Sequence, residues 1–250
     1  MFKKQKKIWV TGASSGIGRA VAEKFAQEDW QVAISARREN LLNEIAKEKN
    51  IKSFPLDVTQ PQNVQNIFNN ILEDFGELDI CFFCSGVYNR KTEKEINIDQ
   101  IKKTFDVNFL GTVNCVKTVE QYFKKKRLGQ IVIVSSIAGY RGLPNSSGYG
   151  PSKAALTNFA ESIFFDFKKY NVKIKVISPG FIKTPMTDTN EFPMPFIKSP
   201  KFAAEKIFKG LTNSSSFEID FPKELTLLLK FLRILPYKLY LFLVDKLVKR

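Results

Sequence analysis

An α/β fold, with a doubly wound parallel sheet of about seven strands and helices on both faces, is what this sequence predicts. Short, almost wholly apolar runs alternate along the chain with longer segments of helical periodicity. Such strands are buried on both faces, as in parallel sheets covered by crossover helices. A glycine-rich stretch joins the first apolar run to the first helical segment. Neither a repeat nor a linker interrupts the pattern, so residues 1–221 are expected to form one domain and 222–250 a helical tail.

Each element follows from its local sequence. The first strand is the run Ile8–Val10, and the segment after it repeats apolar residues at helical spacing. Pro61 and Gly76 are typical of the first turn and the end of a helix, and they bound one between them. The expected strands are 8–10, 31–35, 51–56, 78–84, 129–134, 172–177 and 217–221. The expected helices are 19–28, 40–49, 61–75, 97–126 as one helix or two, and 151–170, and residues 181–200 are expected to form a loop with short helical pieces.

The amino-acid composition limits the kinds of catalytic and metal site that the chain can form. The chain of 250 residues has no histidine, which excludes Ser-His-Asp catalysis, histidine-ligated zinc and acid–base chemistry by imidazole. Acid–base work therefore falls to Tyr, Lys, Asp, Glu or Cys. The net charge of +14 fits an anionic partner such as a phosphate-bearing cofactor, a membrane surface or nucleic acid, and equally a solvated lysine-rich surface. Because no nucleic-acid-binding motif accompanies the charge, no nucleic-acid partner is expected.

The cysteines predict a reducing compartment. Cys81 and Cys84 have a C-x-x-C spacing, but they lie in an expected strand, where residues three apart face opposite sides. Together with Cys115 they are interpreted as buried free thiols, and no metal site is expected. The sequence shows neither a secretory signal nor an apolar segment of the ~18 residues that a spanning helix needs, so a cytoplasmic location is expected.

The glycine-rich stretch predicts a dinucleotide site. Strand, glycine loop and helix bring backbone amides to a phosphate at a helix N-terminus, and glycine lets the backbone approach closely. The expected contacts here are Gly12, Ser14, Ser15, Gly16, Ile17 and Gly18. The second strand ends in Ala36-Arg37-Arg38, where an acid would accept a hydrogen bond from a ribose 2′-hydroxyl. Arginines suit a 2′-phosphate instead, so NADP is expected and NAD is the less favoured cofactor.

A second constellation lies between residues 135 and 153. An apolar strand delivers Ser136 to an edge of the sheet, and the following helical segment carries Tyr149 and Lys153. Their spacing of four places the phenol and the ammonium on one helix face. A hydroxyl, a phenol and an ammonium then converge, which supplies a proton donor and a group to hold a substrate oxygen.

These motifs resemble those of the single-domain short-chain dehydrogenase/reductases over roughly residues 6–220. The resemblance implies a Rossmann-like fold and hydride transfer between NADP(H) and a carbonyl/alcohol pair. It implies a catalytic set of Asn108, Ser136, Tyr149 and Lys153. It adds cofactor contacts at Arg37, Arg38, Asp57, Val58, Gly86, Tyr149, Lys153, Pro179, Gly180, Ile182 and Thr184. It also implies a homodimer or homotetramer.

Within this set, roles are assigned by the resemblance and by residue chemistry. Tyr149 is the expected general acid/base, with Lys153 and an oxidised nicotinamide lowering its pKa. Ser136 is expected to hold the substrate oxygen, and Asn108 to anchor a water that relays protons. The family usually has Asn-Asn-Ala-Gly after the fourth strand, whereas this chain has Phe83-Cys84-Ser85-Gly86 and so lacks the asparagine side chains. An alternative reading is an NADP-binding regulator with little or no turnover.

The segments that set the substrate follow the sixth strand. Residues 181–200 contain Phe192, Met194 and Phe196, which favour an apolar or lipid-like small-molecule substrate. The tail, 222–250, has leucines at helical spacing interrupted by Pro236, with seven basic residues against two acids. Such helices bind membrane surfaces, which would place the protein at the inner face of a membrane. Packing over the active-site mouth or against a partner subunit is an equal alternative.

Overall fold

A computed structural model of the chain describes residues 5–89, 93, 95–188 and 190–248, with side chains through Lys246. Lys249 and Arg250, which the predicted basic tail includes, lie outside the described residues. Within the described part, no helix combines the length and apolarity needed to cross a bilayer.

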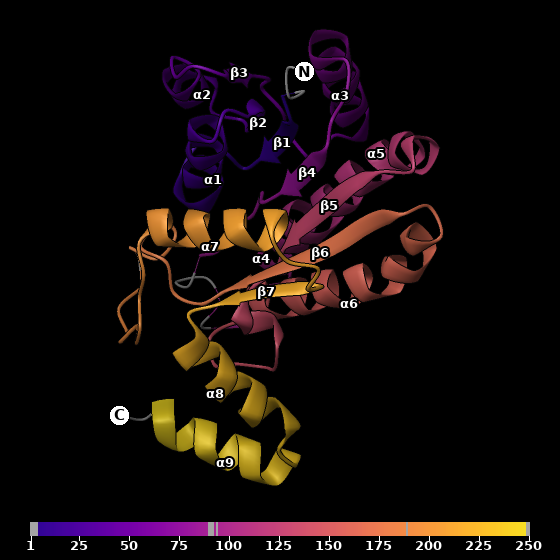
Figure 1. Cartoon of the computed structure of the whole chain (residues 1–250). Coiled ribbons are helices and arrows are strands. Elements are labelled where there is room, and N and C mark those ends of the chain that lie inside the picture. The colour runs from indigo at the N-terminus through magenta and orange to yellow at the C-terminus, as the bar shows by residue number, and fades with distance from the viewer. Residues whose placement is uncertain (1–4, 90–92, 94, 189, 249–250) are drawn as a thin grey trace.

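All seven strands of the sheet are parallel, in the order β3-β2-β1-β4-β5-β6-β7 (Figure 1). They are β1 (Lys7–Thr11), β2 (Gln31–Ser35), β3 (Ile51–Ser53), β4 (Ile80–Phe83), β5 (Gly129–Val134), β6 (Val172–Pro179) and β7 (Glu218–Phe221). The order reverses between β1 and β4, so a crevice opens at their carboxyl ends, where ligands bind in such sheets. The α/β prediction is confirmed.

Helices cover both faces of the sheet. They are α1 (Gly16–Gln27), α2 (Glu39–Ile45), α3 (Pro61–Phe75), α4 (Ile98–Phe105), α5 (Gly111–Lys126), α6 (Tyr149–Lys168), α7 (Pro200–Thr212), α8 (Lys223–Ile234) and α9 (Tyr237–Val248). A π-helical turn, η2 (Asp106–Leu110), joins α4 to α5, and a 3₁₀ turn, η3 (Ile137–Gly139), follows β5. Of the two arrangements expected for 97–126, one helix or two, the structure has two helices with a π-turn between them.

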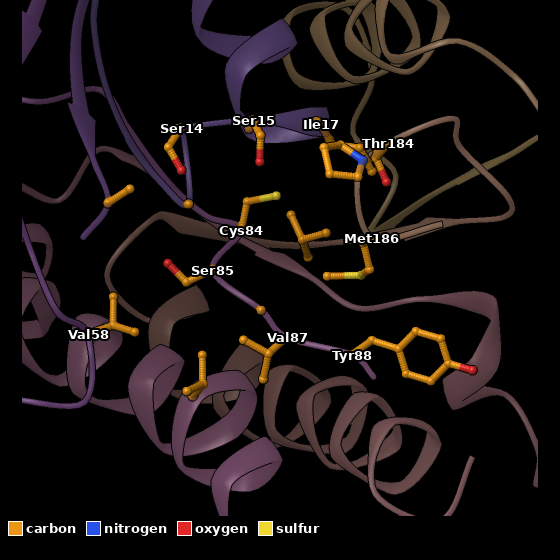
Figure 2. A pocket seen from close by; sticks show the side chains of 18 of the residues that line it. Ser14, Ser15, Ile17, Val58, Cys84, Ser85, Val87, Tyr88, Thr184 and Met186 are labelled. Carbon is orange, nitrogen blue, oxygen red and sulfur yellow. The ribbon is translucent and has the colours of Figure 1, made fainter. Parts of the chain in front are cut away.

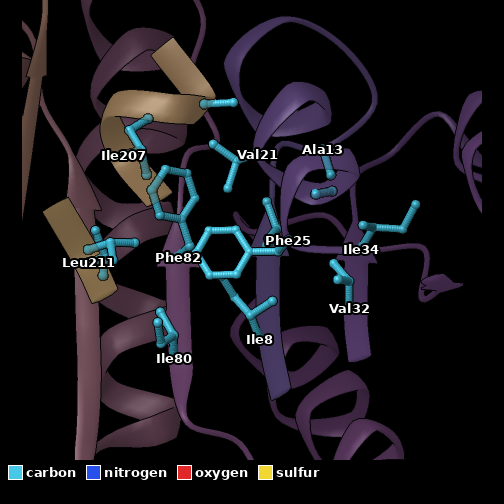
Figure 3. Close-up of a cluster of buried hydrophobic side chains, with 14 of the residues drawn as sticks. Ile8, Ala13, Val21, Phe25, Val32, Ile34, Ile80, Phe82, Ile207 and Leu211 are labelled. Carbon is cyan, nitrogen blue, oxygen red and sulfur yellow. The ribbon is translucent and has the colours of Figure 1, made fainter. Parts of the chain in front are cut away.

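Two buried clusters hold the layers together. On one face, Phe25 of α1 and Ile207 of α7 pack with Ile8, Val32 and Phe82 of the sheet (Figure 3). On the other face, α3, α5 and α6 pack on the strand residues whose side chains point the opposite way, because successive side chains of a strand alternate between the two faces. Cys81 belongs to the second cluster and Cys84 packs against the first, as the alternation predicts. Burying a Phe-sized side chain in such a core stabilises the fold by about 1.5–3 kcal/mol.

Helix α7 is the one large element of the domain that the sequence reading leaves unassigned. Ser199 caps it by accepting a hydrogen bond from Phe202 N at 3.2 Å, and Pro200 occupies its first turn. Its C-terminal end is tied to β6 by Lys175, a buried lysine. The lysine Nζ donates to the carbonyls of Gly210, Ser214 and Ser216 at 3.0, 2.7 and 3.0 Å. Its neutral hydrogen-bond partners satisfy an ammonium that burial would otherwise penalise.

Candidate functional site

A pocket of about 440 Å³ opens at the carboxyl ends of the strands. The segments that follow β1, β2, β3, β4, β5 and β6 all contribute to its wall. Figure 2 shows Ser14 and Ser15 on one side and Val58 and Val87 on the other, with Cys84 between them. The pocket therefore lies where the strand order reverses, as the motifs predict.

The glycine loop fits a group that needs close backbone approach. Gly12 has φ 68°, and a Cβ there would come within 2.8 Å of the Cys84 carbonyl group. A Cβ on Gly18 would lie 2.4 Å from the Gly12 oxygen. At the N-terminus of α1, the Ser15 side chain makes no capping hydrogen bond and the first turn carries no acid, within the described structure. Its amides can therefore receive a phosphate.

Two arginines stand on the side of this loop where the adenosine of a cofactor is expected. Arg38 Nη2 donates to Ser14 Oγ at 2.8 Å and to Ser15 Oγ at 2.9 Å, which ties the end of β2 to the glycine loop. Arg37 also lines the pocket, and both guanidinium groups are exposed. Both arginines lie at the pocket as the sequence predicts, whereas no sequence pattern predicts the hydrogen bonds from Arg38 to the two serines.

The loop after β3 forms the next part of the wall. Asp57 and Val58 both line the pocket, where adenine-side contacts are expected. The Asp57 carboxylate accepts hydrogen bonds from Thr59 N at 3.0 Å and Thr59 Oγ1 at 2.8 Å, which shapes the turn. The Asp57 carboxylate thus already takes part in hydrogen bonds within the loop.

Tyr149 and Lys153 meet at the inner end of the pocket. Both line it, and Lys153 Nζ lies 5.7 Å from the centre of the Tyr149 ring. Nζ donates to the Val134 carbonyl at 2.9 Å, at the end of β5. A Cβ on Gly86 would lie 3.6 Å from Nζ, at ordinary van der Waals distance, so Gly86 borders the ammonium.

Burial shifts the pKa values of this pair in opposite directions. Burial raises the pKa of Tyr149 to about 12, against a smaller lowering by its hydrogen bond with Ser136. Burial lowers the pKa of Lys153 to about 8, since the ammonium loses water there. In the protein alone the phenol is therefore neutral at pH 7. The expected lowering of the Tyr149 pKa by Lys153 together with an oxidised nicotinamide applies to the cofactor-bound protein and stays a prediction.

Asn108 lies buried behind the pocket wall. Its Oδ1 accepts from Val87 N at 2.7 Å, and its Nδ2 donates to the Val87 carbonyl and to Ser152 Oγ, both at 3.1 Å. Both amide protons are thus used within the protein, so the side chain holds the segment after β4 against α6. The predicted water relay would have to use other atoms of this residue.

Glu93 is a site residue that the sequence reading misses. It is buried, and its carboxylate accepts from Gly148 N at 3.1 Å and from Tyr149 N at 3.1 and 3.2 Å. These amides begin α6, where a negative charge is favourable. The residue lies more than fifty positions from Tyr149 in sequence, so no local pattern could reveal the contact.

The remaining expected contacts divide into two groups. Pro179 and Thr184 line the pocket. Gly180 instead packs against α8, where a Cβ would lie 3.0 Å from Pro222 Cδ, and Ile182 is buried in the core. Ser136 reaches the site through its hydrogen bond with Tyr149. Pocket residues that the sequence reading did not select include Val87, Tyr88, Pro185 and Met186.

Comparison with known proteins gives a consistent result. The family model for short chain dehydrogenases matches residues 6–193. An uncharacterized oxidoreductase of Staphylococcus epidermidis is 31% identical over 219 residues, which cover 87% of this chain and 95% of the relative. Of solved structures, ElxO with NADP bound has a TM-score of 0.75 and 29% identity, covering 86% of this chain and 97% of that chain. A short-chain dehydrogenase from Streptomyces avermitilis has a TM-score of 0.83 over 98% of both chains, and at 20% identity it supports the fold.

The close packing at Gly12 can be tested by a pair of alanine variants. Gly12 and Gly76 both have positive φ, 68° and 76°, but a Cβ at Gly76 would meet nothing within 4 Å. Gly76→Ala should therefore lower the free energy of unfolding by about 1–2 kcal/mol, the cost of placing alanine in the left-handed conformation. Gly12→Ala should lower the free energy of unfolding by clearly more, because its Cβ overlaps the Cys84 backbone. Urea denaturation measures both, and equal losses would contradict the packing argument.

Proposed function

Because this chain belongs to the short-chain dehydrogenase family, we propose that its pocket binds NADP(H) and that Tyr149 exchanges a proton with the substrate oxygen. Membership makes the protein an NAD(P)-dependent oxidoreductase acting on CH–OH groups of small molecules. The observation that carries the finer proposal is the convergence of Tyr149, Ser136 and Lys153 beside the glycine loop.

The chemistry follows from what each side chain can donate. A bound nicotinamide supplies or accepts the hydride and, when oxidised, carries a positive charge. A carbonyl that gains a hydride develops negative charge on oxygen, and the Tyr149 phenol donates the proton that neutralises it. The Ser136 hydroxyl, within hydrogen-bonding reach of that phenol, donates to the same oxygen and stabilises it. The phenol is protonated at pH 7 and so carries the proton that carbonyl reduction requires.

Lys153 and Asn108 act as supports in this proposal. The Lys153 ammonium is fixed by the Val134 carbonyl and keeps further protons for a cofactor hydroxyl in the pocket. Asn108 positions Val87 and the adjoining Gly86, which borders the ammonium. A regulator without turnover would have no use for a proton donor in this setting, so the catalytic reading is the one we favour.

Two further features support a finer assignment. The exposed guanidinium groups of Arg37 and Arg38 suit the 2′-phosphate of NADP. Val87, Pro185 and Met186 give part of the pocket an apolar lining. These groups favour an apolar carbonyl or alcohol as the substrate.

Replacing Tyr149 tests the proton transfer. Tyr149→Phe should lower kcat about a hundred- to ten-thousand-fold, because it removes the hydroxyl that donates the proton in this proposal. NADPH affinity, measured by fluorescence titration, should stay within about threefold. Tyr88→Phe is the matched control, since its ring lies 4.8 Å from that of Tyr149, and it should keep most of the turnover. Undiminished turnover by Tyr149→Phe would rule out its assigned role.

Cofactor preference tests the role of the arginines. The protein should have a higher kcat/KM for NADPH than for NADH. Arg37→Gln should reduce that ratio about tenfold or more, because charge-assisted hydrogen bonds to phosphate contribute about 1.5–3 kcal/mol. Lys49→Gln, an exposed cation away from the pocket, should leave the ratio unchanged. A preference for NADH in the unaltered protein would refute the assignment.

The pH profile tests the contact between Glu93 and Tyr149. The Glu93 charge contributes to the raised pKa of Tyr149, so removing the charge should lower that pKa. Alcohol oxidation needs the phenolate, and its rate rises with pH through this pKa. Glu93→Gln should therefore move the rise to lower pH, whereas Glu95→Gln, at an exposed position, should not move it. Identical profiles for both variants would show that Glu93 has only a structural role.

A further inference from the structure

Helices α8 and α9 present large apolar side chains to solvent. Along α8, Leu227, Phe231 and Ile234 are 61%, 57% and 77% exposed, at a spacing that puts them on one face. Tyr237, Leu241 and Phe242 of α9 are exposed by 77%, 60% and 54%. Elsewhere in the described chain, exposed residues of this size are scattered. A cluster of this kind marks an interaction surface, and we call its six residues the outer face.

The opposite side of α8 is already used for packing. Leu225 packs with Ile137 and Tyr140 beside the active-site loop. Lys230 pairs with Glu218 Oε2 at 2.7 Å and with Asp220 Oδ2 at 3.3 Å, so α8 is fastened to β7. Since α8 is fixed through its inner side, the outer face has a defined direction and is not a gap left by loose packing.

The bend between the two helices is held by one arginine. The Arg141 guanidinium lies 4.0 Å from the Tyr240 ring centre and 4.6 Å from that of Tyr237. Its Nη1 donates to the carbonyls of Leu232 and Leu235 at 3.0 and 2.7 Å, which satisfies the end of α8. Figure 1 shows the resulting pair of helices beyond β7, at the end of the molecule away from α1, α2 and α3.

The exposed charged residues of α8 and α9 indicate which kind of partner the outer face binds. Arg233, Lys238 and Lys246 are exposed on the same two helices, and Lys246 Nζ lies 4.6 Å from the Phe242 ring centre. Basic side chains whose stems lie along apolar residues are typical of helices that rest in the plane of an anionic bilayer. A second copy would bring like charges together, and each helix of twelve residues is too short to span a membrane.

We propose that the outer face of α8 and α9 docks this protein onto an anionic membrane surface. The apolar side chains enter the headgroup region while Arg233, Lys238 and Lys246 contact lipid phosphates and carboxylates. The inference is independent of the catalytic proposal, because it rests on residues outside the pocket.

Vesicle flotation tests the inference with the full chain. The protein should float with phosphatidylcholine vesicles that contain phosphatidylserine, much less with phosphatidylcholine alone, and less at high salt. Phe231→Ser combined with Ile234→Ser should abolish flotation. Leu128→Ser, at an exposed leucine remote from the outer face, should not affect it.

Charge removal provides a second measurement. Arg233→Gln combined with Lys238→Gln should weaken partitioning about thirty-fold, since each basic residue near an anionic surface contributes about a factor of five. Lys47→Gln combined with Lys49→Gln, at exposed positions elsewhere, should have no such effect. Failure to float with either vesicle, or equal losses in both charge pairs, would overturn the proposal. So would light scattering that shows a lipid-independent dimer lost on Phe231→Ser, because the face would then belong to a second copy.

Discussion

The end of β5 and the first turns of α6 are joined by hydrogen bonds in both directions, and the site depends on this junction. The Lys153 ammonium donates to the Val134 carbonyl at 2.9 Å, and Ser135 Oγ donates to the Lys153 carbonyl at 2.8 Å. Both residues are buried, where such bonds are costly to lose. Because Tyr149 lies one turn before Lys153, fixing the lysine against the sheet also fixes the phenol. Glu93 completes the arrangement by holding the first amides of α6.

Sequence reasoning located most of the sheet and the main side chains of the site. The strands 31–35 and 129–134 and the helix 61–75 have the predicted bounds, because apolar runs and turn residues mark their ends locally. The third strand ends at Ser53 and not at residue 56, since only three of its residues pair with β2. The sequence expectations include no helix over 200–212, although Ser199 and Pro200 are residues typical of a helix start.

What the sequence could not supply depends on contacts between distant segments. The Asn108 side chain is shared by Val87 and Ser152, and Glu93 meets α6 across a long loop. The direction of the Tyr149 pKa shift likewise depends on burial in the folded protein, which no spacing rule reports. The family resemblance predicts a cofactor contact at Gly180, but in the structure this residue packs against Pro222 and Leu225 at the start of α8. Motif order therefore predicts which segments meet, whereas side-chain roles need the packed structure.

Arg141 belongs to the loop between Ser136 and Tyr149, yet its guanidinium hydrogen-bonds to the C-terminal end of α8 and stacks on Tyr240 of α9. The loop between Ser136 and Tyr149, the residues proposed to hold and protonate the substrate oxygen, therefore also supports the two C-terminal helices. A substitution of Arg141 would leave the last carbonyls of α8 without this donor. Substitutions of Tyr237 and Tyr240 would remove the rings against which the guanidinium stacks. Moving the two C-terminal helices onto a related protein would therefore require transferring the loop that carries Arg141 as well.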